Sequence, residues 1–153
     1  MGTALFDADG DGDLDLYVIS GGSEFDNGSA MYQDRLYSND GKGKFTKSIL
    51  PVTSSSGSCI AVFDVDGDGD MDVFRGGEVV PHKYPYAPQS YLFINEKGKF
   101  IDKTNEIAPA LSKIGMVKSA IWADLNGDKK AELVVTGEWM AVKVFEYTAG
   151  KNE

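Results

Sequence analysis

Three features of the 153-residue sequence predict an all-β fold built from short antiparallel strands. The chain contains 18 glycines, 8 phenylalanines and 7 tyrosines, a composition typical of short strands joined by tight turns. No long stretch shows the apolar period of an amphipathic helix. An aspartate-rich segment with apolar residues on both sides recurs along the chain. Internal repeats of β-strands are therefore expected.

The repeated segment reads FDADGDGDLDLYVISGG from Phe6 and FDVDGDGDMDVFRGG from Phe63. A more distant copy, ADLNGDKKAELVVTGE, begins at Ala123, and the first aspartates of the three copies lie 57 and then 60 residues apart. A second landmark recurs in phase, as RLYSNDGKGKFTK from Arg35 and YLFINEKGKFIDK from Tyr91. Each repeat therefore contains two hairpins in a fixed order, which gives four strands.

A repeat of this length with four antiparallel strands is typical of one blade of a β-propeller, in which sheets pack face to face around an axis. A β-sandwich would not usually contain three in-phase copies of one loop. We therefore expect a partial β-propeller of about three consecutive four-stranded blades. Blade 1 should span residues 1–50, blade 2 residues 51–105, and blade 3 residues 106–153, with its fourth strand missing.

The strand positions follow from the apolar and aromatic runs beside each turn. The strands expected in blade 1 are Thr3–Asp7, Leu14–Ser20, Arg35–Asn39 and Lys44–Ile49. Those expected in blade 2 are Cys59–Asp64, Met71–Arg75, Tyr91–Asn95 and Lys99–Lys103. Those expected in blade 3 are Ser119–Asp124, Glu132–Thr136 and Val142–Tyr147. The one helical segment expected is a turn near Ile107–Ser112.

The alternate aspartates of the repeated loop would repel one another in a regular strand. In a nine-residue loop of the form D-x-D-x-D-G-x-x-D, side chains at positions 1, 3, 5 and 9 and the carbonyl at position 7 can converge on one hard cation. Oxygen ligands that include several carboxylates favour Ca²⁺ over a transition metal. The expected ligands of loop 1 (residues 7–15) are Asp7, Asp9, Asp11, Asp15 and the carbonyl of Asp13. Those of loop 2 (residues 64–72) are Asp64, Asp66, Asp68, Asp72 and the carbonyl of Asp70. Those of loop 3 (residues 124–132) are Asp124, Asn126, Asp128, Glu132 and the carbonyl of Lys130.

Loop 3 is expected to bind its cation more weakly than loops 1 and 2. Gly12 and Gly69 occupy position 6, where the sharp turn favours a positive φ, whereas loop 3 has Lys129 there. An EF-hand is a poor alternative, because position 12 is Val18, Arg75 or Val135 instead of glutamate. The remaining alternative is a solvated acidic turn that binds nothing, and the near-identical repetition of the loop argues against it.

The acidic loops, together with YVISGG, RLYSNDGKGKF and YLFINEKGKF, resemble FG-GAP or VCBS repeats, the blades of integrin-α-like propellers. The stretch GGEVVPHKYPYAPQSYLFINEKGKF followed by GEWM is particularly similar to large bacterial surface or secreted VCBS proteins of the ASPIC/UnbV-associated type. The resemblance implies an extracytoplasmic, Ca²⁺-stabilised propeller used for binding or adhesion. The remaining blades of such a ring would cover the two outer apolar faces of this segment.

Blade topology places the acidic loops at one rim and the loops between second and third strands at the opposite rim. The opposite rim should carry Glu24, Glu78, His82, Tyr84, Tyr86, Glu138 and Trp139. Aromatic side chains interleaved with carboxylates suit a glycan or protein ligand. Alternatively, these residues pack contacts between blades, and the prolines stiffen a long loop.

Composition and the absence of known motifs argue against several classes of partner and of enzyme. The net charge of -9 argues against nucleic acid as a partner, since nucleic acids are bound through an excess of Lys and Arg. No apolar run approaches the length of a membrane span, and no signal peptide is recognisable at the start of the chain. Cys59 is the single cysteine, so no intramolecular disulfide can form. No nucleophile, zinc or phosphate motif is present. The sequence favours a binding module over an enzyme, with a structural scaffold or part of a polysaccharide-processing enzyme as alternatives.

Overall fold

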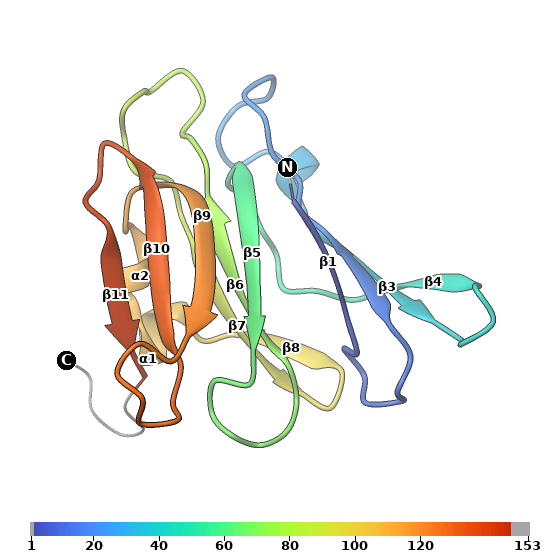
Figure 1. The fold of residues 1–153 in the computed structure, drawn as a ribbon. Coiled ribbons are helices and arrows are strands. Elements are labelled where there is room, and N and C mark those ends of the chain that lie inside the picture. Colours follow the sequence, from blue (N-terminus) through green and yellow to red (C-terminus); the bar gives the residue numbers. More distant parts are fainter. Residues whose placement is uncertain (1, 148–153) are drawn as a thin grey trace.

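The computed structural model describes residues 2–147 and confirms the all-β prediction, with three antiparallel sheets of four, four and three strands (Figure 1). Sheet 1 consists of β1 (Thr3–Phe6), β2 (Asp15–Val18), β3 (Arg35–Asn39) and β4 (Phe45–Ser48). Sheet 2 consists of β5 (Gly57–Phe63), β6 (Asp72–Gly77), β7 (Tyr91–Glu96) and β8 (Lys99–Asp102). Sheet 3 consists of β9 (Met116–Ala123), β10 (Glu132–Glu138) and β11 (Lys143–Glu146). The predicted absence of a fourth strand from sheet 3 concerns the residues after Tyr147, which lie outside the described residues.

Two strands begin earlier than the sequence pattern suggests, and in both cases a β-bulge lies nearby. β9 begins at Met116 because Met116 and Val117 continue the pairing with β10 past a register shift at Thr136/Gly137. β5 begins at Gly57 and has a corresponding shift between Gly57 and Cys59. A bulge breaks the two-residue alternation on which strand prediction depends. The starts of β5 and β9 therefore lie two and three residues earlier than the sequence pattern predicts.

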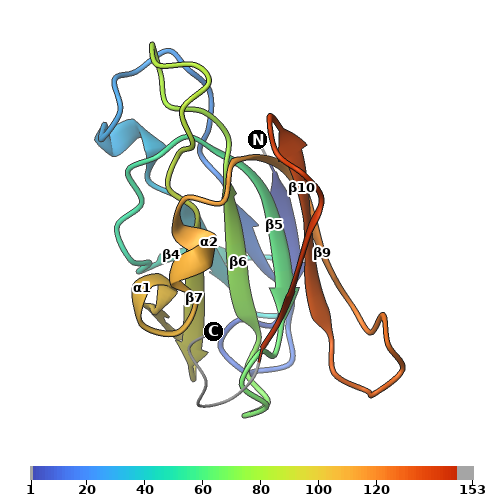
Figure 2. The same ribbon diagram turned by 90° about the vertical axis from the view of Figure 1, so that its left-hand side faces the viewer.

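The helical content is small and lies mainly beside sheet 2. α1 (Thr104–Ile107) and α2 (Pro109–Ser112) contact β7, as Figure 2 shows, and they overlap the predicted helical turn. The side chain of Asp102 accepts a hydrogen bond from the backbone N–H of Thr104 at 3.0 Å, at the start of α1. A short 3₁₀ turn, η1 (Ala30–Tyr32), was not predicted.

Two apolar cores lie between neighbouring sheets. The core between sheets 1 and 2 contains Phe6, Tyr17, Ile19, Leu36, Val73, Tyr91, Phe93 and Phe100. The core between sheets 2 and 3 contains Ala61, Phe74, Leu92, Ile94, Leu111, Val117, Leu133 and Val135. Val73 and Phe74 are consecutive in β6, and they point into different cores because side chains alternate along a strand. Sheet 2 is thus buried on both faces, as a blade within a propeller is.

The two ends of the stack are formed by open apolar faces. Leu5 of sheet 1 is 59% exposed, although Val62, at the same place relative to its acidic loop in sheet 2, packs against the core between sheets 1 and 2. Ile121 of sheet 3 is 61% exposed, whereas the corresponding Ala61 of sheet 2 is buried in the core between sheets 2 and 3. Residues that pack against a neighbouring sheet in sheet 2 therefore correspond to exposed residues on the outer faces of sheets 1 and 3.

The strand directions place the three acidic loops at one end of the sheets. In Figure 1 these loops lie at the lower end, and the long connections from β2 to β3 and from β6 to β7 lie at the upper end. The predicted separation into two rims is therefore visible in the structure.

Candidate functional site

The three acidic loops share one pattern of internal hydrogen bonds, which starts with the aspartate at position 1. Its two carboxylate oxygens accept from the backbone N–H groups of positions 4 and 6. The bonds of Asp7 measure 2.7 and 2.9 Å, those of Asp64 2.7 and 3.0 Å, and those of Asp124 2.6 and 2.9 Å. Such Asx-type bonds stabilise a tight turn without a regular strand or helix.

The tight turn also depends on left-handed backbone at positions 4 and 6. Glycine is found at position 4 in all three loops, with φ between 81° and 82°. At position 6, Gly12 and Gly69 have φ of 91° and 98°, and Lys129 has φ of 71°. The predicted positive φ at position 6 is confirmed, and loop 3 achieves it with a residue that has a Cβ atom.

The carboxylate at position 9 ties the loop to the rest of its sheet. Asp15 accepts from the backbone N–H of Ala8 and of Asn39, both at 2.8 Å. Asp72 does the same with Val65 at 2.7 Å and Asn95 at 2.8 Å. Asn39 lies in β3 and Asn95 in β7, the third strand of each sheet. Because both aspartates are fully buried, these hydrogen bonds from the third strand hold their side chains in one orientation. Glu132 of loop 3 instead accepts from Leu125 N and Asn126 Nδ2, at 2.8 and 3.2 Å, and among the described residues no hydrogen bond from β11 orients it.

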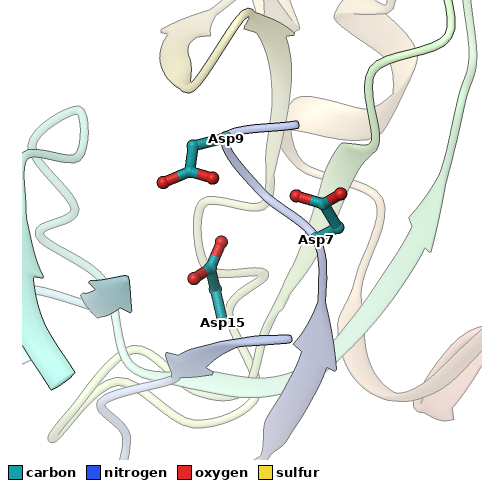
Figure 3. Close-up of side chains that lie close together, drawn as sticks. All are labelled: Asp7, Asp9 and Asp15. Atoms are coloured by element: carbon teal, nitrogen blue, oxygen red, sulfur yellow. The ribbon is translucent and has the colours of Figure 1, made fainter. Parts of the chain in front are cut away.

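In loops 1 and 2 the carboxylates at positions 1, 3 and 9 converge. One oxygen from each of Asp7, Asp9 and Asp15 lies within 4.8 Å of the others, and Figure 3 shows the three side chains around a common point. Asp64, Asp66 and Asp72 form the same arrangement in loop 2. Two oxygens that bind one Ca²⁺ at about 2.4 Å each can be at most about 4.8 Å apart. Both triads therefore have the spacing that a hard cation requires.

Position 5 stands apart from these triads. Asp11 and Asp68 accept hydrogen bonds from the N–H groups of Asp13 and Asp70, each at 2.9 Å, and neither belongs to the converging groups. In loop 3, position 3 is the amide Asn126, and its oxygen accepts from Asp128 N at 2.8 Å. Within the described residues, no converging trio of carboxylates is found in loop 3.

In the absence of a cation, the surroundings of three aspartates in loops 1 and 2 disfavour the ionised form of their side chains. Burial, followed by repulsion from Asp15 and Asp11, raises the pKa of Asp9. The pKa of Asp66 is also raised, mainly by burial. Burial raises the pKa of Asp72 to about 6, even though two backbone N–H groups act in the opposite direction. A divalent cation would offset both burial and repulsion, because it favours the ionised form.

A buried ion pair between sheets 1 and 2 was missed by sequence reasoning. Arg75 of β6 donates from Nε to Oδ2 of Asp34 at 2.9 Å, and both side chains are fully buried. Asp34 also accepts from Tyr17 OH at 3.1 Å and from Ser20 N at 2.8 Å, while Arg75 donates to Ser55 Oγ at 2.7 Å. The guanidinium carbon of Arg75 lies 5.4 Å from the ring centre of Tyr91. The sequence shows only that Arg75 lies in a predicted strand, where alternation directs its side chain to one face of the sheet. It does not identify the partner of Arg75.

The opposite rim brings four of the predicted ligand-binding residues together. Glu24, Glu78, Tyr84 and Glu138 line one pocket of about 220 Å³, which is formed by the β2–β3 and β6–β7 connections together with β9 and β10. Lys118 of β9 lies in the same pocket, with its Nζ 3.4 Å from Oε1 of Glu78 and 3.4 Å from Oε1 of Glu138. Lys118 was not predicted, because nothing in its local sequence marks it as a partner of glutamates in other strands.

The other predicted rim residues lie around this pocket. Trp139 donates from Nε1 to the hydroxyl of Tyr84, and the two rings meet edge to face with centres 6.4 Å apart. His82 is exposed, and its Nε2 lies 3.8 Å from Asp26. Tyr86 lies outside the pocket and lines a separate cavity on the same rim.

Comparison with known proteins concerns the first half of the chain. No curated protein and no solved structure matches the chain. None of the described helices has the length and apolar character needed to cross a membrane. Residues 4–74, which include loops 1 and 2, match the family model of the FG-GAP-like repeat, and this match supports an FG-GAP repeat family for that part of the chain.

Proposed function

We propose that the chain is a calcium-stabilised segment of a β-propeller that serves ligand binding or adhesion outside the cytoplasm, and not catalysis. The observation that carries this proposal is the repeated convergence of carboxylates in loops 1 and 2. The match to the FG-GAP-like repeat covers the same two loops. A glycan or a protein is the proposed ligand, and the rim opposite the acidic loops is its proposed site.

Calcium is the proposed cation because of the ligand atoms and their surroundings. Each triad offers carboxylate oxygens alone, which suit a hard cation. Ca²⁺ accepts six to eight oxygen ligands in flexible geometry, so position 5 and the carbonyl at position 7 can complete the shell. Mg²⁺ requires a stricter octahedron and keeps more water. Loop 3, which lacks the converging trio and has lysines at positions 6 and 7, is proposed as a weaker site.

Further sheets of the same type are the proposed partners of the two open faces. Leu5 and Ile121 are exposed where the corresponding residues of sheet 2 are packed. A sheet that packed on either face would bury these side chains as sheets 1 and 3 bury those of sheet 2.

Thermal unfolding with and without calcium tests the proposal. We expect EDTA to lower the melting temperature and millimolar Ca²⁺ to restore it, because a ligand bound only by the folded state stabilises that state. The same concentration of Mg²⁺ should restore less. The double variant Asp9→Asn/Asp66→Asn keeps acceptor oxygens for the N–H groups of Asp11 and Asp68 but should lose most of the calcium effect.

Asp40→Asn provides the matched control. Asp40 lies in the β3–β4 turn and accepts from two backbone N–H groups, at 3.0 and 3.1 Å, but belongs to no converging group. This variant should respond to Ca²⁺ as the parent chain does. A melting temperature that EDTA leaves unchanged would refute the calcium part of the proposal.

A further inference from the structure

A second cavity lies on the same rim, where the 78–90 segment that joins β6 to β7 meets the linker between β4 and β5 and the segment around α1 and α2. It has a volume of about 1070 Å³, which corresponds to roughly the upper end of the range for small-molecule sites. Side chains from distant parts of the chain line it, among them Asn27, Lys83, Tyr86, Tyr91, Asn105 and Lys113. None of these contributes to the acidic loops, so the cavity is independent of the metal triads.

Hydrogen bonds between different segments hold the walls of this cavity in place. Ser55 Oγ donates to the carbonyl of Gln89 at 2.7 Å, which joins the sheet 1 to sheet 2 linker to the 78–90 segment. Ser112 Oγ donates to Oε1 of Gln89 at 3.0 Å, which adds α2 to the same wall. Tyr91, which also lines the cavity, is buried, and its ring stacks on Phe93. A cavity with cross-linked walls requires little ordering when it binds a ligand.

The cavity is locally positive in a chain of net charge -9. Lys83 and Lys113 are its two cationic side chains, and Asp102 is its one carboxylate. One oxygen of Asp102 already accepts from the N–H and the hydroxyl of Thr104. Between residues 2 and 147, neither lysine forms an ion pair. The two ammonium groups therefore remain available to an anionic ligand.

The other exposed groups of the cavity favour a sugar over a simple anion. Tyr86 is 69% exposed, so one face of its ring is available for stacking against an apolar sugar face. The side chains of Asn27 and Asn105 are exposed at the wall, and each amide can both donate to and accept from hydroxyl groups. A single inorganic anion would occupy a small part of this volume and would not use the ring or the amides.

We propose that this cavity binds an acidic oligosaccharide, a chain of sugar rings that carry carboxylates. Lys83 and Lys113 pair with the carboxylates, Tyr86 stacks on a ring, and the asparagines bind hydroxyls. The neighbouring pocket of Glu24, Glu78 and Glu138 repels the same ligand and confines it to one side of the 78–90 segment. This inference rests on the ligand-binding part of the proposed function and names its ligand class.

Titration calorimetry with a galacturonate hexamer tests the inference, and a neutral glucose hexamer of the same length serves as the comparison ligand. We expect the acidic hexamer to bind and the neutral hexamer to bind at least about tenfold more weakly. Binding should weaken as salt is raised, because exposed charges are screened. Because uronates can themselves bind Ca²⁺, each titration is run at two fixed Ca²⁺ concentrations, and binding that appears at one alone counts against the inference.

Variants locate the site. Lys83→Gln/Lys113→Gln should weaken binding about tenfold or more, and Tyr86→Ala should weaken it several-fold, without lowering the melting temperature, since all three side chains are exposed. Lys47→Gln, on β4 and outside the cavity, is the matched control and should bind as the parent chain does. Unchanged binding by the lysine double variant would overturn the inference.

Two further outcomes would also decide against it. If a polyglutamate peptide of equal charge bound as tightly as the acidic hexamer, the ligand would be an acidic protein segment and not a glycan. If the parent chain bound neither hexamer, the cavity would not be a glycan site. Either result would leave the calcium response of the melting temperature intact, so the failure of this inference and the failure of the calcium proposal are distinguishable.

Discussion

Position 6 of the acidic loops shows how one residue distinguishes otherwise similar copies. The backbone is left-handed at this position in all three loops, with φ of 91° at Gly12, 98° at Gly69 and 71° at Lys129. A residue with a Cβ atom pays about 1 kcal/mol for that conformation, whereas glycine does not. Loop 3 therefore carries a strain that loops 1 and 2 avoid.

The first prediction is that Lys129→Gly stabilises the chain. We expect an increase in the free energy of unfolding of up to about 1 kcal/mol, measured by denaturant titration in EDTA so that cation binding does not contribute. Lys130→Gly, at the next position, is the control, since Lys130 does not have a positive φ and its replacement should not stabilise. Equal effects of the two substitutions would show that strain at position 6 is not what distinguishes loop 3.

The second prediction compares position 5 in loops 2 and 3. Asp68 and Asp128 each accept one backbone hydrogen bond, at 2.9 and 2.8 Å, so Asp68→Ala and Asp128→Ala remove similar protein contacts. In EDTA the two variants should lose similar stability. In millimolar Ca²⁺, Asp68→Ala should lower the melting temperature more, because we propose that loop 2 binds its cation more tightly than loop 3 does. Equal losses in calcium would contradict the expected order of the sites.

At the scale of the residue, the sequence predicts the acidic and glycine positions well but not the contacts that orient them. Alternate aspartates and the glycine at position 6 are local features, and the structure places positive φ where they predict it. The bond from Asn95 N to Asp72 spans 23 residues, and the Arg75 pair with Asp34 spans 41. Neither leaves a local signal in a single sequence, since the partners meet through the packing of strands and sheets.

At the scale of the secondary-structure elements, the main feature is the packing between neighbouring sheets. Apolar packing dominates both cores, yet the contact between sheets 1 and 2 also contains the buried charges of Asp34 and Arg75. Removal of one member of a buried pair leaves the other without compensation and usually costs about 3–5 kcal/mol. A packing of β6 against sheet 1 that separated Asp34 from Arg75 would therefore leave a buried charge without a partner.

The third prediction is that Asp34→Ala lowers the free energy of unfolding by about 3 kcal/mol or more, as measured by denaturant titration. The double variant Asp34→Leu/Arg75→Met should recover part of the loss, because it removes both charges. Asp26→Ala is the control, since the Asp26 side chain is 95% exposed and its loss should change stability little. A minor effect of Asp34→Ala would mean that the pair does not hold the sheets together.

The hairpins and their order within each sheet were predictable because turns and aromatic runs are local. The early starts of β5 and β9 were not, since bulges interrupt the alternation in both strands. Lys118 also interrupts the apolar run of β9, which makes the start of this strand harder to predict. In the structure its ammonium group lies near both Glu78 and Glu138.

At the scale of the whole molecule, the chain is a stack of sheets with two open faces. Leu5 and Ile121 expose apolar surface at opposite ends of the stack, at places where sheet 2 is packed. Exposed apolar faces of this kind promote association. The repeat period was enough to predict the stacking, because each copy must bury its faces against a neighbour.

The fourth prediction is that the chain associates as its concentration is raised and that Leu5→Lys or Ile121→Lys reduces this association. Sedimentation velocity at several concentrations provides the measurement. Met31→Lys is the matched control, because Met31 is 61% exposed but lies on η1, away from both open faces. If Leu5→Lys and Ile121→Lys associated as strongly as the parent chain, the two open faces would not be the surfaces through which the chain associates.

Titration calorimetry of Ca²⁺ into the chelator-treated chain tests the central claim most directly, because it counts the sites and measures their affinities. The account predicts two sites with dissociation constants of about 10⁻⁴ to 10⁻³ M, and a third that is about tenfold weaker or more. Asp9→Asn should remove one of the two stronger sites, and Asp66→Asn the other. A titration that shows no calcium uptake, or strong sites that persist in the Asp9→Asn/Asp66→Asn double variant, would contradict it.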